Sequence, residues 1–306
     1  MSWWEMTGDG TPRAVGSPFD SARFGRPVER LTVPAGAGPS FGPVREAVLG
    51  SAADVIVLRY PAGHVGWFAE LTSLGRTAVF ADSLAYWRLR AGRGRAPEPR
   101  ADLRAACPLP AAAVPGPVSD IFAAYRSHYV ANPLFDASAA LEGYREWAVR
   151  SAASGRCVAL REHDAHDAHD DGSGVLALAT LADDDGPGGE PTGGNGTGGG
   201  NGDGDGITGG GDLGGGGGDG GGGGGGVTEI LLAGVVSRAR GRGLYGHLLA
   251  AVEERVLARG GREVVISTQG HNTGVQRAWA RYGFEPVHAF LTVHLIRSRL
   301  LRGPRR

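Results

Sequence analysis

Hydrophobic residues follow two spacings along this 306-residue chain, and each spacing predicts a different kind of element. Alternating or continuous apolar runs are typical of strands, whereas apolar residues three and four positions apart indicate one buried face of a helix. The pattern predicts strands at 26–33, 53–60, 77–87, 156–162, 174–182, 227–236, 263–268 and 288–296. It predicts helices at 65–75, 121–130, 138–153, 244–258 and 274–283. Helices alternate with strands, which predicts an α/β or α+β architecture.

Breaks in this pattern predict the organisation of the chain. A strand–helix–strand half is expected at 1–95, an Ala/Pro/Arg-rich linker at 96–118, a larger unit at 119–297 and a basic tail at 298–306. The larger unit holds a Gly-rich insertion at 183–226, which we expect to be a disordered hairpin extension because so few side chains could be buried there. Closure entropy rises slowly with loop length, so the fold can tolerate such an insertion.

The tract HDAHDAHDD at 163–171 repeats every three residues and offers His163, His166 and His169. Imidazole and carboxylate groups bind metals, so weak metal binding is one interpretation. A polar hairpin loop expanded by repetition is the interpretation we favour, and we expect no metal site.

All 31 basic residues are arginine, which is typical of a GC-rich bacterial genome and weakens arguments from arginine content. The formal net charge is -1, but residues 182–226 hold eight acids and no base, so the remainder carries +7 and suits a phosphorylated ligand. Aromatic residues do not punctuate the Arg/Gly segments, so we expect no nucleic-acid binding. No apolar run is long enough to span a membrane. Cys107 and Cys157 lack metal-like spacing, which favours a reducing cytoplasm.

The stretch AGVVSRARGRGLYGHLL (233–249) combines the end of a strand, an Arg/Gly turn and the start of an amphipathic helix. Unpaired N–H groups at a helix N-terminus favour an anion, and glycines allow close approach of the backbone. The turn lacks the sequence of a P-loop and that of a dinucleotide-binding fingerprint. It therefore predicts a site for some other phosphate-bearing ligand.

This turn resembles the signature [QR]-x-x-G-x-[GA] of the GNAT superfamily of acyl-CoA-dependent N-acetyltransferases. Residues 238–243 fit it literally, but the register that keeps the helix in phase comprises Arg240, Gly241, Arg242, Gly243, Leu244 and Tyr245, with tyrosine at the last position. The resemblance implies that the amides of this turn bind the pyrophosphate of acetyl-CoA. It also implies that the strand edge at Ala233, Gly234 and Val235 pairs with the pantetheine arm.

A second block, NTGVQRAWARYGF (272–284), is similar to the N-x(6)-Y-x(3)-GF element of the same superfamily. The resemblance implies that Asn272 contacts the cofactor arm, and that residues 119–297 form a GNAT fold with a mixed central sheet. Looser matches in the N-terminal half resemble acetyltransferases of nucleotide-linked amino sugars, such as the enzyme acting on dTDP-fucosamine. They imply a small-molecule amine as the acceptor, and leave a homodimer open.

Two positions depart from the family pattern. Trp279 replaces the tyrosine that usually protonates the leaving thiolate, and its indole cannot serve as an acid. Ser267 stands where some members carry a glutamate base. His271, His128 and Tyr129 are the candidates for acid–base chemistry, and His294 is a further histidine to place. We therefore expect an N-acetyltransferase, with a catalytically idle acyl-CoA-binding module as the alternative.

Overall fold

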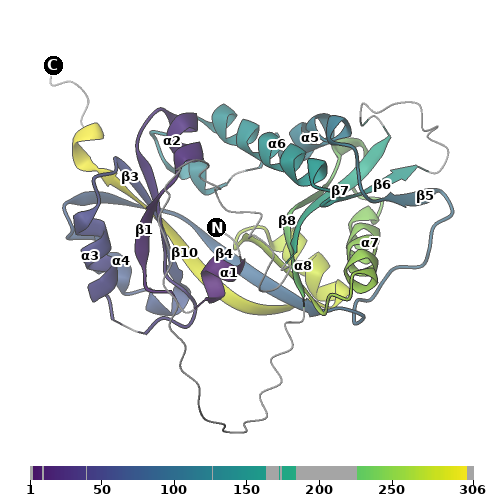
Figure 1. Cartoon of the computed structure of the whole chain (residues 1–306), viewed down its shortest axis with the longest axis horizontal. Helices are drawn as coiled ribbons and strands as arrows, with labels where there is room; N and C mark the ends of the chain where they lie inside the picture. Colours follow the sequence, from purple (N-terminus) through teal and green to yellow (C-terminus); the bar gives the residue numbers. More distant parts are fainter. Residues whose placement is uncertain are drawn as a thin grey trace, which may run out of the picture.

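The computed structural model describes residues 3–8, 10–38, 40–125, 127–162, 172, 174–183 and 226–301. Within them, a single sheet of ten strands runs in the order β1-β2-β3-β10-β4-β9-β8-β7-β6-β5 (Figure 1). The strands are β1 (Arg13–Gly16), β2 (Val28–Thr32), β3 (Val55–Pro61), β4 (Arg76–Arg90), β5 (Leu103–Ala106), β6 (Cys157–Glu162), β7 (Val175–Asp183), β8 (Val227–Val235), β9 (Glu263–Gln269) and β10 (Glu285–Arg297). Parallel and antiparallel pairs occur together, so the sheet is mixed, as the sequence predicted.

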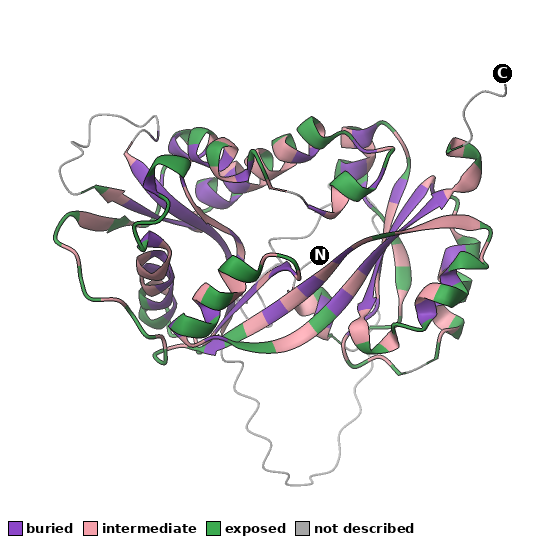
Figure 2. Cartoon of the chain, turned by 180° about the vertical axis from the view of Figure 1, so that it is seen from behind, coloured by how far each residue is buried: buried purple, intermediate pink, exposed green. Residues whose placement is uncertain are grey.

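Helices cover both faces of this sheet. The α-helices are α1 (Trp3–Thr7), α2 (Pro18–Phe24), α3 (Gly42–Gly50), α4 (Trp67–Thr72), α5 (Pro115–Phe122), α6 (Ala137–Ala153), α7 (Leu244–Ala258) and α8 (Thr273–Tyr282), joined by short 3-10 turns such as η3 (His128–Ala131) and η4 (Ser237–Ala239). Helices α2, α5 and α6 lie over one face (Figure 1), while α3, α4, α7 and α8 pack on the other. Figure 2 shows the buried residues along the central strands and on the inward sides of these helices.

The second half of the chain follows the predicted elements closely. The helix predicted at 244–258 is α7 (Leu244–Ala258), and its Leu248 and Val252 lie in the core beneath the sheet. The sequence also predicted strands at 227–236 and 263–268, which correspond to β8 and β9.

One prediction between the halves is wrong. The helix expected at 121–130 is instead α5, which starts at Pro115 and ends at Phe122; Pro115 has the fixed backbone angle that suits a helix start. Asp120 does not cap this helix but accepts a hydrogen bond from the Ser237 amide. The expected linker also contains the short strand β5, which extends the sheet beyond β6.

The unit β2-α3-β3-α4-β4 is repeated as β8-α7-β9-α8-β10. In each unit the first two strands pair in parallel across a helical crossover, β2 with β3 and β8 with β9. The final strands are exchanged, because β4 pairs with β9 of the second unit and β10 pairs with β3 of the first. The two repeats therefore share the centre of the sheet, where β4 and β10 pair with each other.

The repeats differ where their parallel strands end. All five residues of β2 pair with β3, from Val28 to Thr32. By contrast, β8 pairs with β9 only from Val227 to Ile230, although it stays paired with β7 up to Val235. Leu231 is an extra residue at a bulge in β8, and bulges bend the strand that carries them. The sheet thus opens into a wedge between β8 and β9, and only in the second repeat.

Three segments with sequence-based predictions lie outside the described residues. They are 184–225 of the Gly-rich insertion, the His/Asp tract with His163, His166 and His169, and 302–306 of the basic tail.

Candidate functional site

The open edge of β8 forms one wall of the wedge. Ala233, Gly234 and Val235 pair with β7 on one side, and β9 no longer pairs with them on the other. Alternate backbone N–H and C=O groups therefore face the wedge, as on any sheet edge, and an extended ligand can hydrogen-bond to them. A side chain at Gly234 would collide with Ile121, since its Cβ would stand 2.2 Å from the Ile121 Cγ2. The glycine thus lets α5 approach this edge.

The Arg/Gly turn connects this edge to α7. Gly241 and Gly243 have φ of 77° and 74°, and a Cβ at either position would meet open space. Left-handed backbone of this kind is readily adopted by glycine alone. Gly243 caps α7 without a side-chain hydrogen bond to the first-turn amides, so these amides are available to an anion. Leu244 is buried, and only its backbone amide can take part.

The two arginines of the turn contact neighbouring protein groups. Arg240 donates to the carbonyl oxygens of Val235 and Ile121, each at 3.3 Å. Arg242 lies 3.6 Å from Glu162 and 3.9 Å from Asp102, in pairs whose members are substantially exposed. Exposed ion pairs contribute little stability, so Arg242 can exchange them for a diphosphate at small cost.

Tyr245 and Trp279, which both differ from the residues usual in the family, contact each other. The Trp279 Nε1–H donates a 3.0 Å hydrogen bond to the Tyr245 hydroxyl oxygen. Trp279 is almost fully buried, and burial raises the pKa of Tyr245 to about 12. Because the hydroxyl oxygen accepts from the indole, its own proton is free to be donated.

Asn272 lies at the wedge side of α8. Its side-chain amide donates to Thr268 Oγ1 at 3.0 Å, and it stands at the position before the helix without capping it. His271, the neighbouring acid–base candidate, is exposed and does not line the cavity described next.

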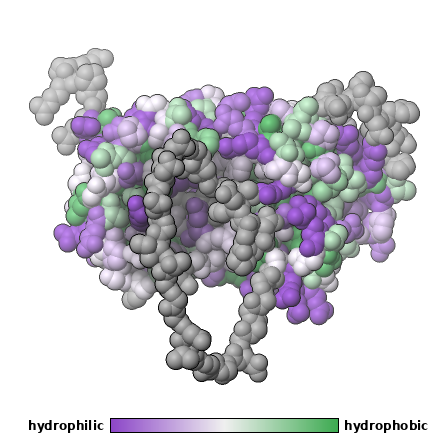
Figure 3. Space-filling model, in the orientation of Figure 1, coloured by the Kyte–Doolittle hydropathy of each residue, from purple (hydrophilic) through white to green (hydrophobic). Residues whose placement is uncertain are grey.

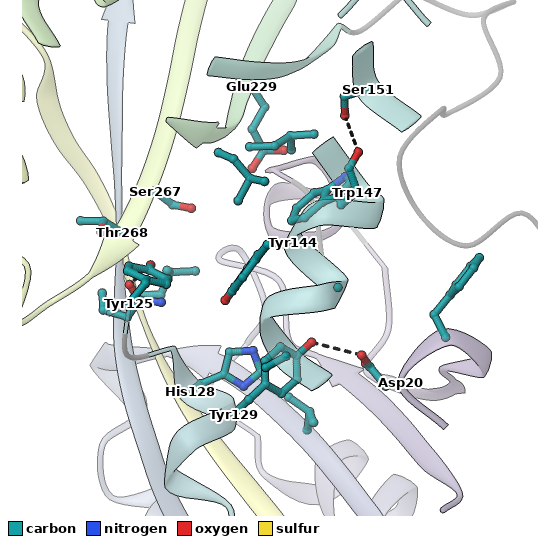
Figure 4. A pocket seen from close by; sticks show the side chains of 18 of the residues that line it. Asp20, Tyr125, His128, Tyr129, Tyr144, Trp147, Ser151, Glu229, Ser267 and Thr268 are labelled. Atoms are coloured by element: carbon teal, nitrogen blue, oxygen red, sulfur yellow. Dashed lines mark hydrogen bonds between the residues drawn. The ribbon is translucent and has the colours of Figure 1, made fainter. Parts of the chain in front are cut away.

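A cavity of about 560 Å³ lies on the sheet face beneath α2 and α6, beside the wedge. Figure 4 shows labelled side chains of its lining, which come from α2, α6, β8, β9, η3 and the segment before η3. Its size is typical of sites for small molecules. Its lining includes Asp20, Arg30, Arg59, His128, Tyr129, Arg150, Glu229, Leu231 and Ser267. On the outer surface, hydrophilic and hydrophobic residues are interspersed (Figure 3).

Glu229 is the buried carboxylate of this cavity, and sequence reasoning did not identify it. It lies on β8 two residues before the Leu231 bulge, and only 3% of it is exposed. The Trp3 amide donates to its Oε2 at 2.8 Å, but burial outweighs this contact and raises the pKa of Glu229 to about 7. A carboxylate of this pKa suits proton transfer near neutral pH. The signal in the sequence was one acid inside an otherwise apolar strand, VTEILLAGVV.

Two of the acid–base candidates, His128 and Tyr129, do line the cavity. The Tyr129 hydroxyl donates to Asp20 at 3.2 Å, and Arg30 binds the same carboxylate at 2.7 and 2.9 Å. Burial opposes the ionisation of Asp20, but Arg30 outweighs it and holds the pKa of Asp20 below its usual value. Burial also raises the pKa of Tyr129. Tyr129 is therefore held as a hydrogen-bond donor to Asp20.

His128 contacts the buried His294, which lies on β10. The ring nitrogens His128 Nδ1 and His294 Nε2 are 2.9 Å apart. Burial lowers the pKa of both rings, that of His294 to about 3, so both are neutral at neutral pH. His294 thus lies under the cavity rather than facing solvent.

The remaining observations on the described residues concern metal ligands, membrane spans, cysteines and one buried carboxylate. Over these ranges, no three His, Cys, Asp or Glu side chains converge as metal ligands, and no helix is long and apolar enough to cross a membrane. Cys107 and Cys157 are both free thiols. Both carboxylate oxygens of the buried Asp82 lack a hydrogen-bond partner, and nothing in the structure explains it.

Residues 195–284 match the model of the acetyltransferase (GNAT) family. No curated protein matches the chain. Among solved structures, a GCN5-related N-acetyltransferase from Sphaerobacter thermophilus is 15% identical, with a TM-score of 0.50 over 93% of this chain and 76% of that one. This likeness concerns the fold.

Two further structures resemble the chain more distantly. One is a GCN5-related N-acetyltransferase from Kribbella flavida, at 15% identity and a TM-score of 0.45 over 88% of this chain and 81% of that one. The other is a tandem GNAT protein from the clavulanic acid biosynthesis pathway, at 14% identity and 0.48, over 92% and 77%.

Proposed function

We propose that this chain moves an acetyl group from acetyl-CoA to the amine of a small molecule, a proposal supported by the match of residues 195–284 to the acetyltransferase (GNAT) family model. The observation that carries this proposal is the position of Glu229. It lies in the cavity, one residue before β8 parts from β9, so a base for the amine stands beside the edge that would hold the thioester.

The wedge and the turn have the features that acetyl-CoA needs. We assign the pyrophosphate to the amides of Gly241, Gly243 and Leu244, with Arg240 and Arg242 as charged partners; the contacts that these arginines now make are to carbonyls and exposed acids. The pantetheine arm would pair with the open edge at Ala233–Val235. Asn272, which lies across the wedge, would contact the same arm.

The reaction then needs a proton acceptor, and we assign this role to Glu229. The amine nitrogen attacks the thioester carbonyl carbon, Glu229 takes a proton from the nitrogen, and the C–S bond breaks to release the thiolate of CoA. Ser267, which occupies the position of the glutamate in some relatives, lines the cavity on the neighbouring strand. The base is therefore supplied from β8 rather than from β9.

The group that donates a hydrogen bond to the leaving thiolate differs from the one in the family pattern. We assign its hydrogen-bond donor to Tyr245, whose hydroxyl oxygen is held by Trp279. A tyrosine of pKa about 12 stays protonated against a thiolate of pKa ~8.5, so it stabilises the leaving group without giving up its proton. The low pKa of the thiol also makes its thiolate a good leaving group.

An idle acyl-CoA-binding module is not favoured, because Glu229 supplies the base that Ser267 cannot be, and Tyr245 supplies the thiolate donor that Trp279 cannot be. As a finer proposal, the acceptor is the amine of a nucleotide-linked amino sugar, which the looser N-terminal resemblance suggests. The +7 charge outside the Gly-rich insertion supports an acceptor that carries phosphate.

Calorimetry with acetyl-CoA and a thiol-release screen of amines test this function together. We expect acetyl-CoA to bind, and free CoA thiol to appear with at least one amine among amino sugars, nucleotide amino sugars and polyamines. Absence of any heat with acetyl-CoA would refute the proposal, and binding without turnover across the whole panel would support the idle module.

A further inference from the structure

The ring orientation of His128 is set by a chain of hydrogen bonds that starts on the backbone. The Leu134 amide donates to Asn132 Oδ1 at 3.0 Å, which fixes the orientation of the Asn132 side-chain amide. If that amide were flipped, its NH₂ group would face the Leu134 N–H, and two donors would meet. Asn132 Nδ2 then lies 3.1 Å from His294 Nδ1, and can only donate to it.

The protons on both histidine rings follow from this orientation. A neutral imidazole carries one N–H, and His294 Nδ1 accepts, so the proton of His294 is on Nε2. This N–H points at His128 Nδ1, 2.9 Å away, which must accept. The proton of His128 is therefore on Nε2. The low pKa values of both rings keep them neutral and the chain intact. His128 thus offers the cavity a hydrogen-bond donor and cannot act as the base.

Arg59 lies on the same face of the sheet as His294, and its charge acts on His128 as well. On β3 Arg59 pairs with Thr292 of β10. His294 lies two residues further along β10, so the side chains of Arg59 and His294 are diagonal neighbours. Arg59 is 8% exposed and lines the cavity. Its Nε donates to Thr292 Oγ1 at 3.2 Å, and no carboxylate of the described chain lies within ion-pair distance of it.

The other arginines of the cavity are already engaged. Arg30 is bound to Asp20 at 2.7 Å, Arg23 pairs with Glu146 at 2.9 Å, and Arg150 lies over the Phe19 ring at 4.8 Å; Arg156 also has a partner. Asp82, on the far side of Thr292 from Arg59, does not line the cavity. A buried guanidinium whose terminal nitrogens have no protein anion is costly unless a ligand supplies one.

We propose that the acceptor amine carries an anionic group, a carboxylate or a phosphate, which binds between the Arg59 guanidinium and the His128 Nε2–H. This inference rests on the proposed function and names the acceptor class for it. Arg59 is on β3 and Glu229 on β8, so four strand spacings, or ~19 Å, separate their backbones. Both side chains reach inward from these strands, which shortens the distance between their charged groups. The anion is thus several bonds from the reacting nitrogen.

Thiol release with matched amine pairs tests this proposal. In the carboxylate arm 6-aminohexanoate is compared with 6-amino-1-hexanol, and in the phosphate arm glucosamine 6-phosphate is compared with glucosamine. The anionic member of at least one pair is expected to have the higher kcat/KM, and the arm in which it does identifies the anion. Equal kcat/KM within both pairs, with turnover present, overturns the proposal.

Variants separate the two donors from the rest of the cavity. Arg59→Met should raise the KM for the anionic amine roughly 10- to 100-fold, a larger factor than for the neutral amine. Arg59→Lys, which keeps the charge, should restore part of the loss. Arg150→Met is the matched control; if it, rather than Arg59→Met, removed the preference, the assignment would be wrong.

A test independent of turnover uses the ring nitrogens. In ¹⁵N spectra of the full chain, the proton of His128 should be on Nε2, and adding 6-aminohexanoate or glucosamine 6-phosphate should shift that nitrogen. Asn132→Asp replaces the donor by an acceptor and should move the protons of both rings to Nδ1. A proton on His128 Nδ1 in the unaltered chain contradicts the proposal. Failure of all amines to release thiol, with these spectra as expected, would instead contradict the proposed function.

Discussion

At the scale of single residues, the site depends on burial rather than on residue type. Glu229 is a useful base because burial raises its pKa to about 7, whereas burial lowers the pKa of His128 and leaves it a neutral donor. The two residues that looked out of place, Tyr245 and Trp279, are explained by one 3.0 Å hydrogen bond between them.

Replacing Glu229 by Gln should lower kcat by roughly 10²- to 10⁴-fold, the usual contribution of a general base. Binding of acetyl-CoA should be unchanged, because Glu229 faces the acceptor cavity. Steady-state kinetics and calorimetry measure the two effects. Glu263→Gln, on the neighbouring strand but away from the cavity, is the control and should retain activity.

The pH dependence follows from the same carboxyl. Glu229 acts as a base only when ionised, and its pKa of about 7 lies above the usual value for glutamate. The kcat/KM for the amine should therefore rise with pH through about 7, in addition to any rise from ionisation of the amine itself. A profile without an inflection near this pH would remove Glu229 from the mechanism.

Tyr245→Phe deletes the hydroxyl that Trp279 holds. If this hydroxyl hydrogen-bonds to the leaving thiolate, kcat should fall about tenfold, corresponding to ~1.4 kcal/mol, with little change in the KM for acetyl-CoA. Tyr282→Phe, on the same side of the sheet but bonded to Glu253, should leave kcat unchanged. If Tyr245→Phe and Tyr282→Phe had equal kcat, Tyr245 would not be the hydrogen-bond donor to the thiolate.

At the scale of elements, the wedge and the start of α7 act together. The strand parts from its neighbour at Ile230, and the glycine turn directs the first amides of α7 to the same opening. A ligand with an extended arm and a diphosphate matches both features.

A matched pair of glycines on α7 separates binding from stability. Gly243 and Gly260 flank the helix with φ of 74° and 75°, and a Cβ at either would meet open space. Alanine at each should cost a similar ~1–2 kcal/mol of stability in urea unfolding. Only Gly243→Ala should weaken acetyl-CoA binding, by about tenfold in calorimetry. Equal affinities in the two variants would move the pyrophosphate away from this turn.

Helix α7 also holds the segment that follows β4. Its buried Glu253 accepts hydrogen bonds from the Gly92 and Gly94 amides, at 2.6 and 2.9 Å, and from Tyr282. Glu253→Ala should lower the free energy of unfolding by about 2–4 kcal/mol, because it leaves buried donors unpaired. Glu254→Ala, on the exposed side of the same helix, should change it by less than ~0.5 kcal/mol in the same denaturation experiment.

The sequence predicted elements best where periodicity was long and the ends were marked. α7 was predicted to the residue, because fifteen residues keep their apolar spacing after Gly243. α5 was misplaced because its start depends on Pro115 and its contacts on the distant Ser237. The relation between His128 and His294, 166 residues apart, depends on tertiary packing, and no local spacing predicts it.

At the scale of the molecule, two repeats are joined by exchanged strands, and only the second opens into a wedge. The first repeat contributes Arg59 and Arg30 to the acceptor cavity instead. In the proposed function, the second repeat would hold the acetyl donor, and the first would bind the far end of the acceptor.

Because β4 and β10 are exchanged, the two repeats should unfold together. Calorimetry is expected to show a single two-state transition, and saturating acetyl-CoA, although it binds only at the second repeat, should shift the whole transition upward. Two transitions, with only one of them moved by acetyl-CoA, would show that the repeats are independent.

The exchange of strands also affects the order in which the parts of the protein can fold. β10 follows the other nine strands along the chain, yet it lies between β3 and β4 at the centre of the sheet. During synthesis the first repeat therefore leaves the ribosome with one edge of β3 unpaired, and waits for residues 285–297 before its sheet is complete. Exposed strand edges invite wrong pairing. We therefore expect a pause late in translation, or a chaperone bound to the nascent chain, to change the yield of folded protein.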